Sequence, residues 1–228
     1  MYTGETLHRH HERIQIKICG ITAAEDAMAC AAWGVDAVGL VFYPKSPRYV
    51  TPAQAADITG VLPPHIARVG VFVNESEETI MAAAYQCRLH AVQLHGAEPP
   101  ELARRLMEQG LIVIKCLYVS GRPAVSEASQ YHVSAFLVEC SAGKLPGGNA
   151  MTWDWSAARD FNEQYPFIIA GGLGPENVAE AIAAARPDAV DVSSGVESAP
   201  GRKDTRRVRD FVYAVRLSEI TQPTRRIF

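Results

Sequence analysis

Short runs rich in aliphatic and β-branched residues alternate along the chain with longer, alanine-rich stretches in which apolar residues recur at helical spacing. The short runs predict eight strands, at residues 14–18, 36–42, 66–73, 90–94, 111–119, 135–139, 166–170 and 188–192. The longer stretches predict helices, at residues 23–34, 51–62, 76–86, 99–110, 175–187 and 204–217. Strand and helix therefore alternate along most of the chain.

This alternation is typical of α/β proteins with a parallel sheet, which either stays open and doubly wound or closes into a barrel. Eight strands in 228 residues favour the closed form, since a (β/α)8 TIM barrel has roughly 250 residues. We expect a single-domain (β/α)8 barrel over residues 14–220. A polar, disordered extension at 1–13 would precede it, and a C-terminal tail at 221–228 would follow it.

The composition is that of a soluble protein with a large core and nearly balanced charge. Hydrophobic residues make up 48% of the chain, and 22 basic against 25 acidic residues give a net charge of -3. This balance argues against a nucleic-acid surface, and no apolar run is long enough to span a membrane. The first residues lack the apolar segment of a secretory signal. We expect a cytoplasmic monomer or homodimer whose partner is a small molecule.

The cysteine and histidine patterns predict neither a disulfide framework nor a metal site. The five cysteines are odd in number and scattered without CxxC spacing, which indicates reduced thiols; they are Cys19, Cys30, Cys87, Cys116 and Cys140. The HRHH run at residues 8–11 has no matching acidic or cysteine cluster. We therefore assign no residue to a metal.

Two Gly/Ser turns follow the last two predicted strands, and both suit a phosphate. The first contains Gly171 and Gly172, and the second contains Ser193, Ser194 and Gly195. Glycine has no Cβ, so the backbone N–H groups of such turns can approach an anion closely. In (β/α)8 barrels the loops after the seventh and eighth strands frequently bind phosphate. The sequence predicts that these five residues form a phosphate site.

The other candidate residues lie just after the predicted strands, where the active face of a (β/α)8 barrel forms. They are Cys19, Lys45, Ser46, Arg48, Asn74, His95, Glu139 and Asp191. Because side chains alternate along a strand, Lys17 shares one side with Cys19, and Gln93 shares one side with His95. If that side faces the barrel interior, these groups converge at one end.

Cys19 has two possible roles. A lone cysteine is most often a buried, inert thiol. Its place at a strand end and the positive charge of nearby Lys17 would instead favour the thiolate, which can act as a base. Lys17 could also form a structural ion pair with Asp191, because the eighth strand of a barrel closes against the first. The two roles of Lys17 are compatible.

Six blocks follow the first residues in a distinctive order: KICGIT (17–22), GLVFYPKSPRYV (39–50), VGVFVNES (69–76), VQLHG (92–96), IIAGGLGPENV (168–178) and DVSSGVESAPGRKD (191–204). Together they resemble the phosphoribosylanthranilate isomerase family of tryptophan biosynthesis, one of the pathways of aromatic amino-acid biosynthesis. The resemblance implies an aldose-ketose isomerase that needs no cofactor. Its reaction would be the Amadori rearrangement of N-(5-phosphoribosyl)anthranilate to 1-(2-carboxyphenylamino)-1-deoxyribulose 5-phosphate.

The same resemblance implies an acid and a base. Cys19 matches the base, and Glu139 in AFLVEC occupies the position of the acid, where the family normally has aspartate in a pattern such as LLLD. The extra methylene of glutamate moves the carboxyl by about an ångström, and misplacement on that scale can lower a rate about 100-fold. Asp191 is kept as an alternative proton donor, or as a group that orients Lys17 and Cys19.

The resemblance also implies contacts with the substrate. Arg48 matches the residue that would bind the anthranilate carboxylate with its guanidinium fork, and Gln93 and His95 would line the pocket between the two ends of the substrate. Residues 202–204 match a closing motif that we interpret as structural. The loop at 147–155 reads GGNAMTWDW where the family usually reads GGTGKTFDW, which either alters loop closure and anthranilate contacts or is neutral.

Two other functions remain possible at this stage. Another barrel enzyme that acts on a phosphorylated sugar, such as an epimerase or a lyase, would keep the phosphate turns but would not need the KICG and SPR blocks. A catalytically weakened barrel that binds a phosphorylated ligand would explain Glu139 and the altered loop. The isomerase accounts for the largest number of blocks.

Overall fold

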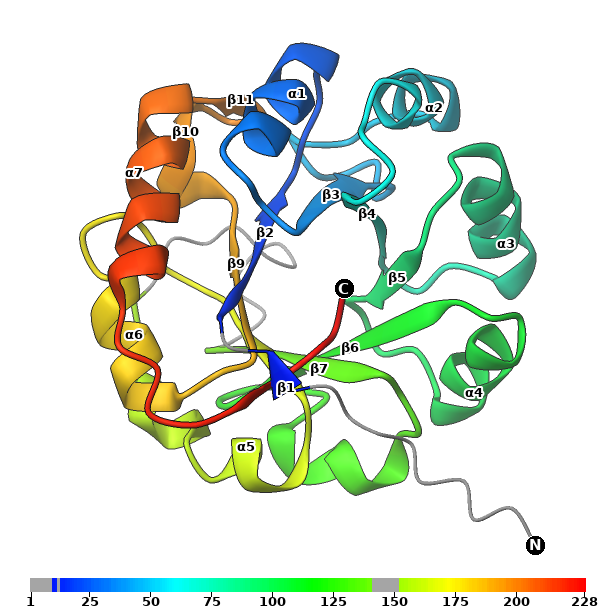
Figure 1. The fold of residues 1–228 in the computed structure, drawn as a ribbon. Coiled ribbons are helices and arrows are strands. Elements are labelled where there is room, and N and C mark those ends of the chain that lie inside the picture. The colour runs from blue at the N-terminus through cyan, green and yellow to red at the C-terminus, as the bar shows by residue number, and fades with distance from the viewer. Residues whose placement is uncertain (1–9, 12, 141–151) are drawn as a thin grey trace, which may run out of the picture.

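The computed structural model describes residues 10–11, 13–140 and 152–228. Eight parallel strands, β2 to β9, close into a barrel in sequence order, and β9 pairs with β2. Figure 1 shows the strands around a common axis, with helices outside them. The strands are β2 (Gln15–Cys19), β3 (Ala37–Val41), β4 (Ala67–Phe72), β5 (Ala91–Leu94), β6 (Ile112–Tyr118), β7 (Ala135–Glu139), β8 (Phe167–Ile169) and β9 (Ala189–Val192). The predicted (β/α)8 barrel is confirmed, and each predicted strand overlaps an observed one.

All six predicted helices are present, and each covers the barrel after the strand that precedes it. They are α1 (Ala24–Ala32), α2 (Pro52–Gly60), α3 (Glu77–Gln86), α4 (Pro100–Glu108), α6 (Val178–Ala185) and α7 (Thr205–Leu217). Caps explain several of the boundaries. The side chain of Thr51 accepts a hydrogen bond from Gln54 N–H before α2, and Asp204 accepts bonds from two backbone N–H groups at the start of α7.

The connections after β6 and β7 contain shorter helices. The first holds the 3-10 helix η1 (Val125–Gln130). In the part of the second that the structure describes lie the 3-10 helix η2 (Trp155–Ala158) and the short α5 (Phe161–Gln164). Residues 147–151 of the altered loop lie outside the described residues. None of the helices in the described chain is long and apolar enough to cross a membrane.

The buried side chains form two shells. The outer shell packs between strands and helices, with members such as Leu40 and Val92, and a separate inner cluster contains small residues such as Ala37 and Ala91. The two sets alternate along strands β3 to β9, as the pleat requires, so the second set fills the barrel interior. Continuing the inner set towards the strand ends reaches the predicted polar residues, which explains why they meet at one end.

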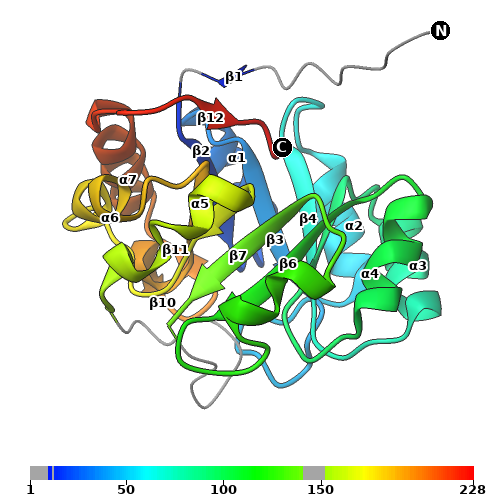
Figure 2. The same ribbon diagram turned by 90° about the horizontal axis from the view of Figure 1, so that it is seen from below.

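The C-terminal tail crosses the other end of the barrel. The two-residue strand β12 (Thr224–Arg225) pairs with β1 (His10–His11), and in Figure 2 the C-terminus lies at the end opposite to the hairpin of β10 (Glu197–Ala199) and β11 (Arg202–Lys203). Residues 1–9 and 12 of the expected disordered extension lie outside the described residues.

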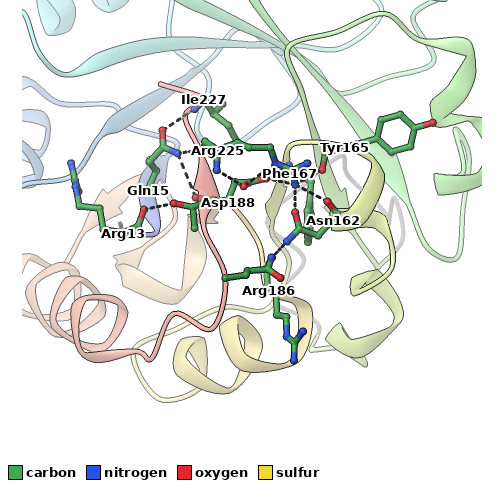
Figure 3. A network of polar contacts seen from close by, with 11 residues as sticks. Arg13, Gln15, Asn162, Tyr165, Phe167, Arg186, Asp188, Arg225 and Ile227 are labelled. Atoms are coloured by element: carbon green, nitrogen blue, oxygen red, sulfur yellow. Dashed lines mark hydrogen bonds and ion pairs between the residues drawn. The ribbon is translucent and has the colours of Figure 1, made fainter. Parts of the chain in front are cut away.

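A polar network fastens this tail to the starts of β2 and β9 (Figure 3). Arg225 forms an ion pair of 2.9 Å with Asp188, whose side chain is 1% exposed, and it also donates to Asn162. Gln15 Oε1 accepts backbone bonds from Ile227 N–H at 3.0 Å and from Phe228 N–H at 2.9 Å. Polar groups that would otherwise be unpaired inside the base of the barrel are satisfied by the tail.

Candidate active site

A cavity opens at the carboxyl ends of the strands, and most of the predicted site residues line it. The predicted residues at the cavity are Cys19, Ser46, Arg48, Gln93, His95, Glu139, Gly171, Gly172, Asp191, Ser193 and Ser194. Further lining comes from residues that sequence reasoning did not select, namely Val41, Tyr43, Pro47, Val71, Val73, Ala170, Leu173 and Val192. The cavity therefore combines apolar walls with polar groups that come from most of the strands.

Three predicted candidates do not line this cavity: Lys45, Asn74 and Gly195. Asn74 has a structural role, because its side-chain oxygen accepts from Ala97 N–H at 2.7 Å and its own N–H donates to Glu98 at 2.9 Å. Its backbone is left-handed, with φ of 54°, a conformation that asparagine tolerates better than most residues. Gly195 contributes to the cavity through packing, as described below.

Lys17, Cys19 and Asp191 form one wall of the site. Lys17 Nζ donates to Asp191 Oδ2 at 2.8 Å, and the Lys17 side chain is fully buried. Although burial alone would lower the pKa of Lys17, the Asp191 carboxylate and the Cys19 sulfur raise it above its ordinary value. Burial raises the pKa of Asp191 even though Lys17 opposes this. The predicted ion pair is confirmed, and it holds a permanent positive charge beside the Cys19 sulfur.

Glu139 and His95 form the second polar group. Glu139 Oε2 lies 3.6 Å from His95 Nε2, and Cys116 Sγ lies 3.7 Å from the same nitrogen. Gln93 Nε2 lies 2.7 Å from His95 Nδ1 and so orients the imidazole ring. Burial alone would lower the pKa of His95, but the Cys116 sulfur and the Glu139 carboxylate raise it well above its ordinary value. An imidazole held in this way beside a carboxyl group can share its proton with it.

The two Gly/Ser turns lie side by side. Gly171 and Gly172 have positive φ of 88° and 70°, which a residue with a side chain rarely adopts. Gly195 approaches the other turn so closely that a Cβ there would collide with the Leu173 carbonyl oxygen. Among the described residues the buried Ser193 Oγ has no hydrogen-bond partner, although it belongs to a residue that lines the cavity. The turns therefore have the shape and the free polar group of an anion site.

Arg48 reaches the cavity from the loop after β3, held by a residue that sequence reasoning missed. Its Nε and Nη2 donate to the two carboxylate oxygens of Glu197 at 2.8 and 2.7 Å. Lys203 Nζ donates to Glu197 at 2.7 Å and to the Ser193 carbonyl at 3.2 Å. The two cations lower the pKa of Glu197 despite its burial, so Glu197 is a carboxylate that orients Arg48. Only its place within the block at 191–204 hinted at a role.

The arrangement offers groups for acid and base chemistry together with two anion sites. Proton donors or acceptors are present at Cys19, Glu139 and Asp191. Arg48 lines the cavity near the Ser193 turn, and the Gly/Ser turns offer an anion site of their own. The free oxygen of Asp191, Oδ1, has no hydrogen-bond partner among the described residues. The site therefore fits a substrate that carries two negative groups and that exchanges protons with side chains of the cavity.

Comparison with known proteins gives consistent results. The sequence profile of the family described as N-(5'phosphoribosyl)anthranilate (PRA) isomerase matches residues 16–214. A protein of that name from Desulfatibacillum aliphaticivorans is 47% identical over 215 residues, which cover 94% of this chain and 99% of that protein. The crystal structure of the phosphoribosylanthranilate isomerase from Thermotoga maritima has a TM-score of 0.82 and 43% identity, covering 89% of this chain and 98% of that one.

A further crystal structure contains a ligand. It is described as phosphoribosylanthranilate isomerase in complex with reduced 1-(o-carboxyphenylamino)-1-deoxyribulose 5-phosphate. It has a TM-score of 0.79 and 42% identity to this chain, and the match covers 89% of this chain and 98% of that one.

Proposed function

The chain belongs to the N-(5'-phosphoribosyl)anthranilate isomerase family, and we propose that Cys19 and Glu139 are the base and the acid of its reaction. The enzyme is an isomerase of tryptophan biosynthesis that converts an aminoaldose into a ketose by an Amadori rearrangement. The observation that carries the proposed roles is the convergence of Cys19, Glu139 and Asp191 on one cavity that also has two places for anions.

The rearrangement requires a proton for the ring oxygen and a base for the proton on C2. Protonation of the furanose oxygen breaks its bond to C1, so the ring opens to a protonated imine. Removal of the C2 proton then gives an enolamine, which tautomerises to the ketone. Each step is a proton transfer by a positioned side chain, and each such group contributes about 100- to 10,000-fold to a rate.

Cys19 suits the base because a cation lies next to its sulfur. Lys17 is fully buried and paired with Asp191, so its charge cannot move away from Cys19. Cys19 lines the cavity that the substrate would occupy, and a cation beside the sulfur is the usual surrounding of a reactive cysteine. Lys17 is therefore a positioning residue that acts through Cys19.

Glu139 suits the acid because its carboxyl group faces the same cavity beside His95. The contact of 3.6 Å with His95 Nε2 gives the longer glutamate side chain a fixed neighbour. His95 keeps a proton next to Glu139, since its pKa is raised by Cys116 and Glu139 despite burial. Asp191 is the alternative acid, because its pKa is raised and its Oδ1 has no partner among the described residues.

The two ends of the substrate bind at separate polar groups of the cavity. Gly171, Gly172, Ser193, Ser194 and Gly195 form the phosphate site, mainly through backbone N–H groups and the free Ser193 hydroxyl. Arg48 binds the anthranilate carboxylate through the nitrogen that Glu197 does not occupy, Nη1, while Gln93 and His95 line the pocket between the two ends of the substrate.

The class of ligand, the cellular location and the oligomeric state complete the proposal. The partner is a small phosphorylated molecule, in keeping with the ligand named for the related structure. We infer that the protein is cytoplasmic, because all five cysteines are free thiols, and that it is a monomer or a homodimer that binds neither nucleic acid nor a membrane.

The test follows the loss of phosphoribosylanthranilate fluorescence with the wild type and four variants: Cys19→Ser, Glu139→Gln, Asp191→Asn and Glu180→Gln. Glu180 is an exposed residue of α6, so the Glu180→Gln variant is the matched control and should keep full activity. We expect Cys19→Ser and Glu139→Gln to lose at least about 100-fold in kcat. Wild-type turnover no faster than the spontaneous reaction would overturn the function. Full activity of Glu139→Gln with an inactive Asp191→Asn would move the acid to Asp191.

A further inference from the structure

His95, Cys116 and Glu139 form a compact cluster of potential metal ligands inside the barrel. One ligand atom of each residue lies within 4.8 Å of the other two, and all three residues are buried. His95 Nε2 is 3.7 Å from Cys116 Sγ and 3.6 Å from Glu139 Oε2. The three come from the ends of neighbouring strands, β5, β6 and β7, and the side chains of Cys116 and Glu139 share the interior face.

The two separations from His95 Nε2 fit a tetrahedral metal ion, and the third, between Cys116 and Glu139, is at most 4.8 Å. With a sulfur at about 2.3 Å and nitrogen or oxygen at about 2.1 Å from zinc, tetrahedral geometry places the ligand atoms about 3.4 to 3.6 Å apart. The two distances to His95 Nε2 match this within about 0.3 Å. Closing the cluster on an ion therefore requires only side-chain adjustments by Cys116 and Glu139, with no movement of the barrel strands.

The surroundings of His95 supply the usual support of a ligating imidazole. A histidine that binds a metal through one nitrogen generally donates its other N–H to a polar partner. Gln93 provides that partner at 2.7 Å from Nδ1, and its Oε1 is buried without a hydrogen-bond partner in the described part of the chain. Turning the Gln93 amide over brings Oε1 to accept from Nδ1–H, which satisfies the free oxygen and leaves Nε2 as the ligand atom that faces Cys116 and Glu139.

The cluster is open on one side. His95 and Glu139 line the cavity, whereas the Cys116 side chain is fully buried. A metal ion would therefore enter through the cavity, take its three ligands from the barrel and keep a fourth position for water or a second ligand. Three protein ligands with one open position is the pattern of accessible zinc sites rather than closed structural ones.

We propose that His95, Cys116 and Glu139 form a binding site for a borderline divalent cation of the zinc class, and that occupation of this site inhibits the enzyme. The combination of thiolate, imidazole and carboxylate selects such cations over magnesium and calcium, which prefer oxygen ligands. Binding releases the thiol proton of Cys116, the carboxyl proton of Glu139 and any proton on His95 Nε2 to solvent, and the metal then coordinates the Glu139 carboxylate. Glu139 is then unable to donate a proton, so inhibition rests on its proposed role as the acid, whereas binding does not.

Cys19, the thiol that lines the cavity, is a poorer metal ligand than Cys116. Cys19 Sγ lies beside the buried ammonium group of Lys17, and that positive charge repels a cation. The ion pair between Lys17 and Asp191 also occupies one carboxylate oxygen there. Charge therefore directs the metal to the side of the cavity that contains His95.

Cobalt(II) provides a direct probe, because a thiolate ligand produces an intense near-ultraviolet charge-transfer band. We expect one equivalent of cobalt to bind the tag-free wild type with this band. Cys116→Ala should lose the band, and Cys30→Ala should retain it, since Cys30 is an equally buried thiol in α1. Zinc should compete with cobalt and inhibit the wild type, and its inhibition constant, measured relative to the metal-free activity of each variant, should rise at least tenfold in Cys116→Ala.

Two further variants test the ligands Cys116 and Glu139. Cys116→Ser replaces Cys116→Ala if the latter does not fold, and Glu139→Gln should weaken cobalt binding at least tenfold even though it is inactive. Equal cobalt affinity and an unchanged band in the Cys116 variants would overturn the site. A band that persists there but disappears in Cys19→Ser would assign the metal to the other wall. Cobalt binding without inhibition by zinc would overturn the inhibitory role and would place the acid elsewhere than Glu139.

Discussion

The buried pair of Lys17 and Asp191 allows a quantitative test of how the site is held. Replacing Asp191 with asparagine keeps the shape of the side chain and removes its charge. The Lys17 side chain is 0% exposed, so its ammonium group cannot reach water. Loss of one partner of a buried ion pair costs about 3 to 5 kcal/mol of unfolding free energy. The asparagine oxygen and Cys19 Sγ still accept from Lys17, which places our expectation at the lower end, about 3 kcal/mol.

Urea unfolding followed by circular dichroism measures this loss. For a chain of this size a loss of about 3 kcal/mol corresponds to a decrease of about 6 to 12 °C in Tm. The double variant Lys17→Met/Asp191→Asn removes the buried charge together with its partner, and should recover at least half of the lost free energy, because apolar groups often replace buried ion pairs without loss. It should still be inactive, since Cys19 has lost its neighbouring cation.

The result that refutes this reasoning is specific. A loss below about 1 kcal/mol for Asp191→Asn would mean that Lys17 is not held as a buried charge. A double variant whose loss equals the sum of the two single losses would show that the residues do not interact. A stable and fully active double variant would show that the pair of Lys17 and Asp191 has only a structural role and that Lys17 is not needed to activate Cys19.

Three further predictions concern other parts of the barrel. Arg225→Ala should lower the unfolding free energy by about 2 to 3 kcal/mol in urea titrations, because Asp188 stays buried without its cation. A loss below roughly 0.5 kcal/mol, which is typical of surface substitutions, would contradict the anchoring of the tail. Gly195→Ala should raise KM at least about tenfold, because its Cβ meets the Leu173 carbonyl and displaces the phosphate turn; unchanged steady-state kinetics would contradict this. Glu197 has a lowered pKa, so its contribution to stability is present above the ordinary glutamate pKa of about 4.3 and is lost as the pH falls through its lower folded value. Glu197→Gln should therefore have a shallower decrease of unfolding free energy below about pH 4.5 than the wild type, and equal slopes would show that the carboxylate does not gain from its two cationic partners.

The repeating strands and helices could be predicted because each is a local pattern. Strand β7, for example, matches its predicted bounds of residues 135–139. The short helices after β6 and β7 carry no long apolar period, and the structure uses 3-10 turns there. Contacts between distant segments have no local signal at all. Gln15 and Ile227 are 212 residues apart, and their bond depends on barrel closure and on the path of the tail.

The same limit applies to the candidate site. Cys19 and Asp191 could be selected because each stands at a strand end, and their positions lie on the cavity. Glu197 could not be selected, since its role depends on a fork of Arg48 that extends from another loop. Cys116 looked like any other isolated thiol, because its nearness to His95 follows only from the neighbouring register of β5 and β6.

The position of Glu139 acquires a physical explanation from these neighbours. Considered alone, a glutamate in place of an aspartate displaces the carboxyl group by about an ångström. In the barrel the longer side chain reaches a histidine whose ring is already oriented by Gln93, so the carboxyl position is determined by contacts with β5 as well as by its own strand. The same reach brings Glu139 within ligand distance of the cluster that contains Cys116. Proton donation and metal binding therefore depend on one geometry, and a change that shortens this side chain affects both together.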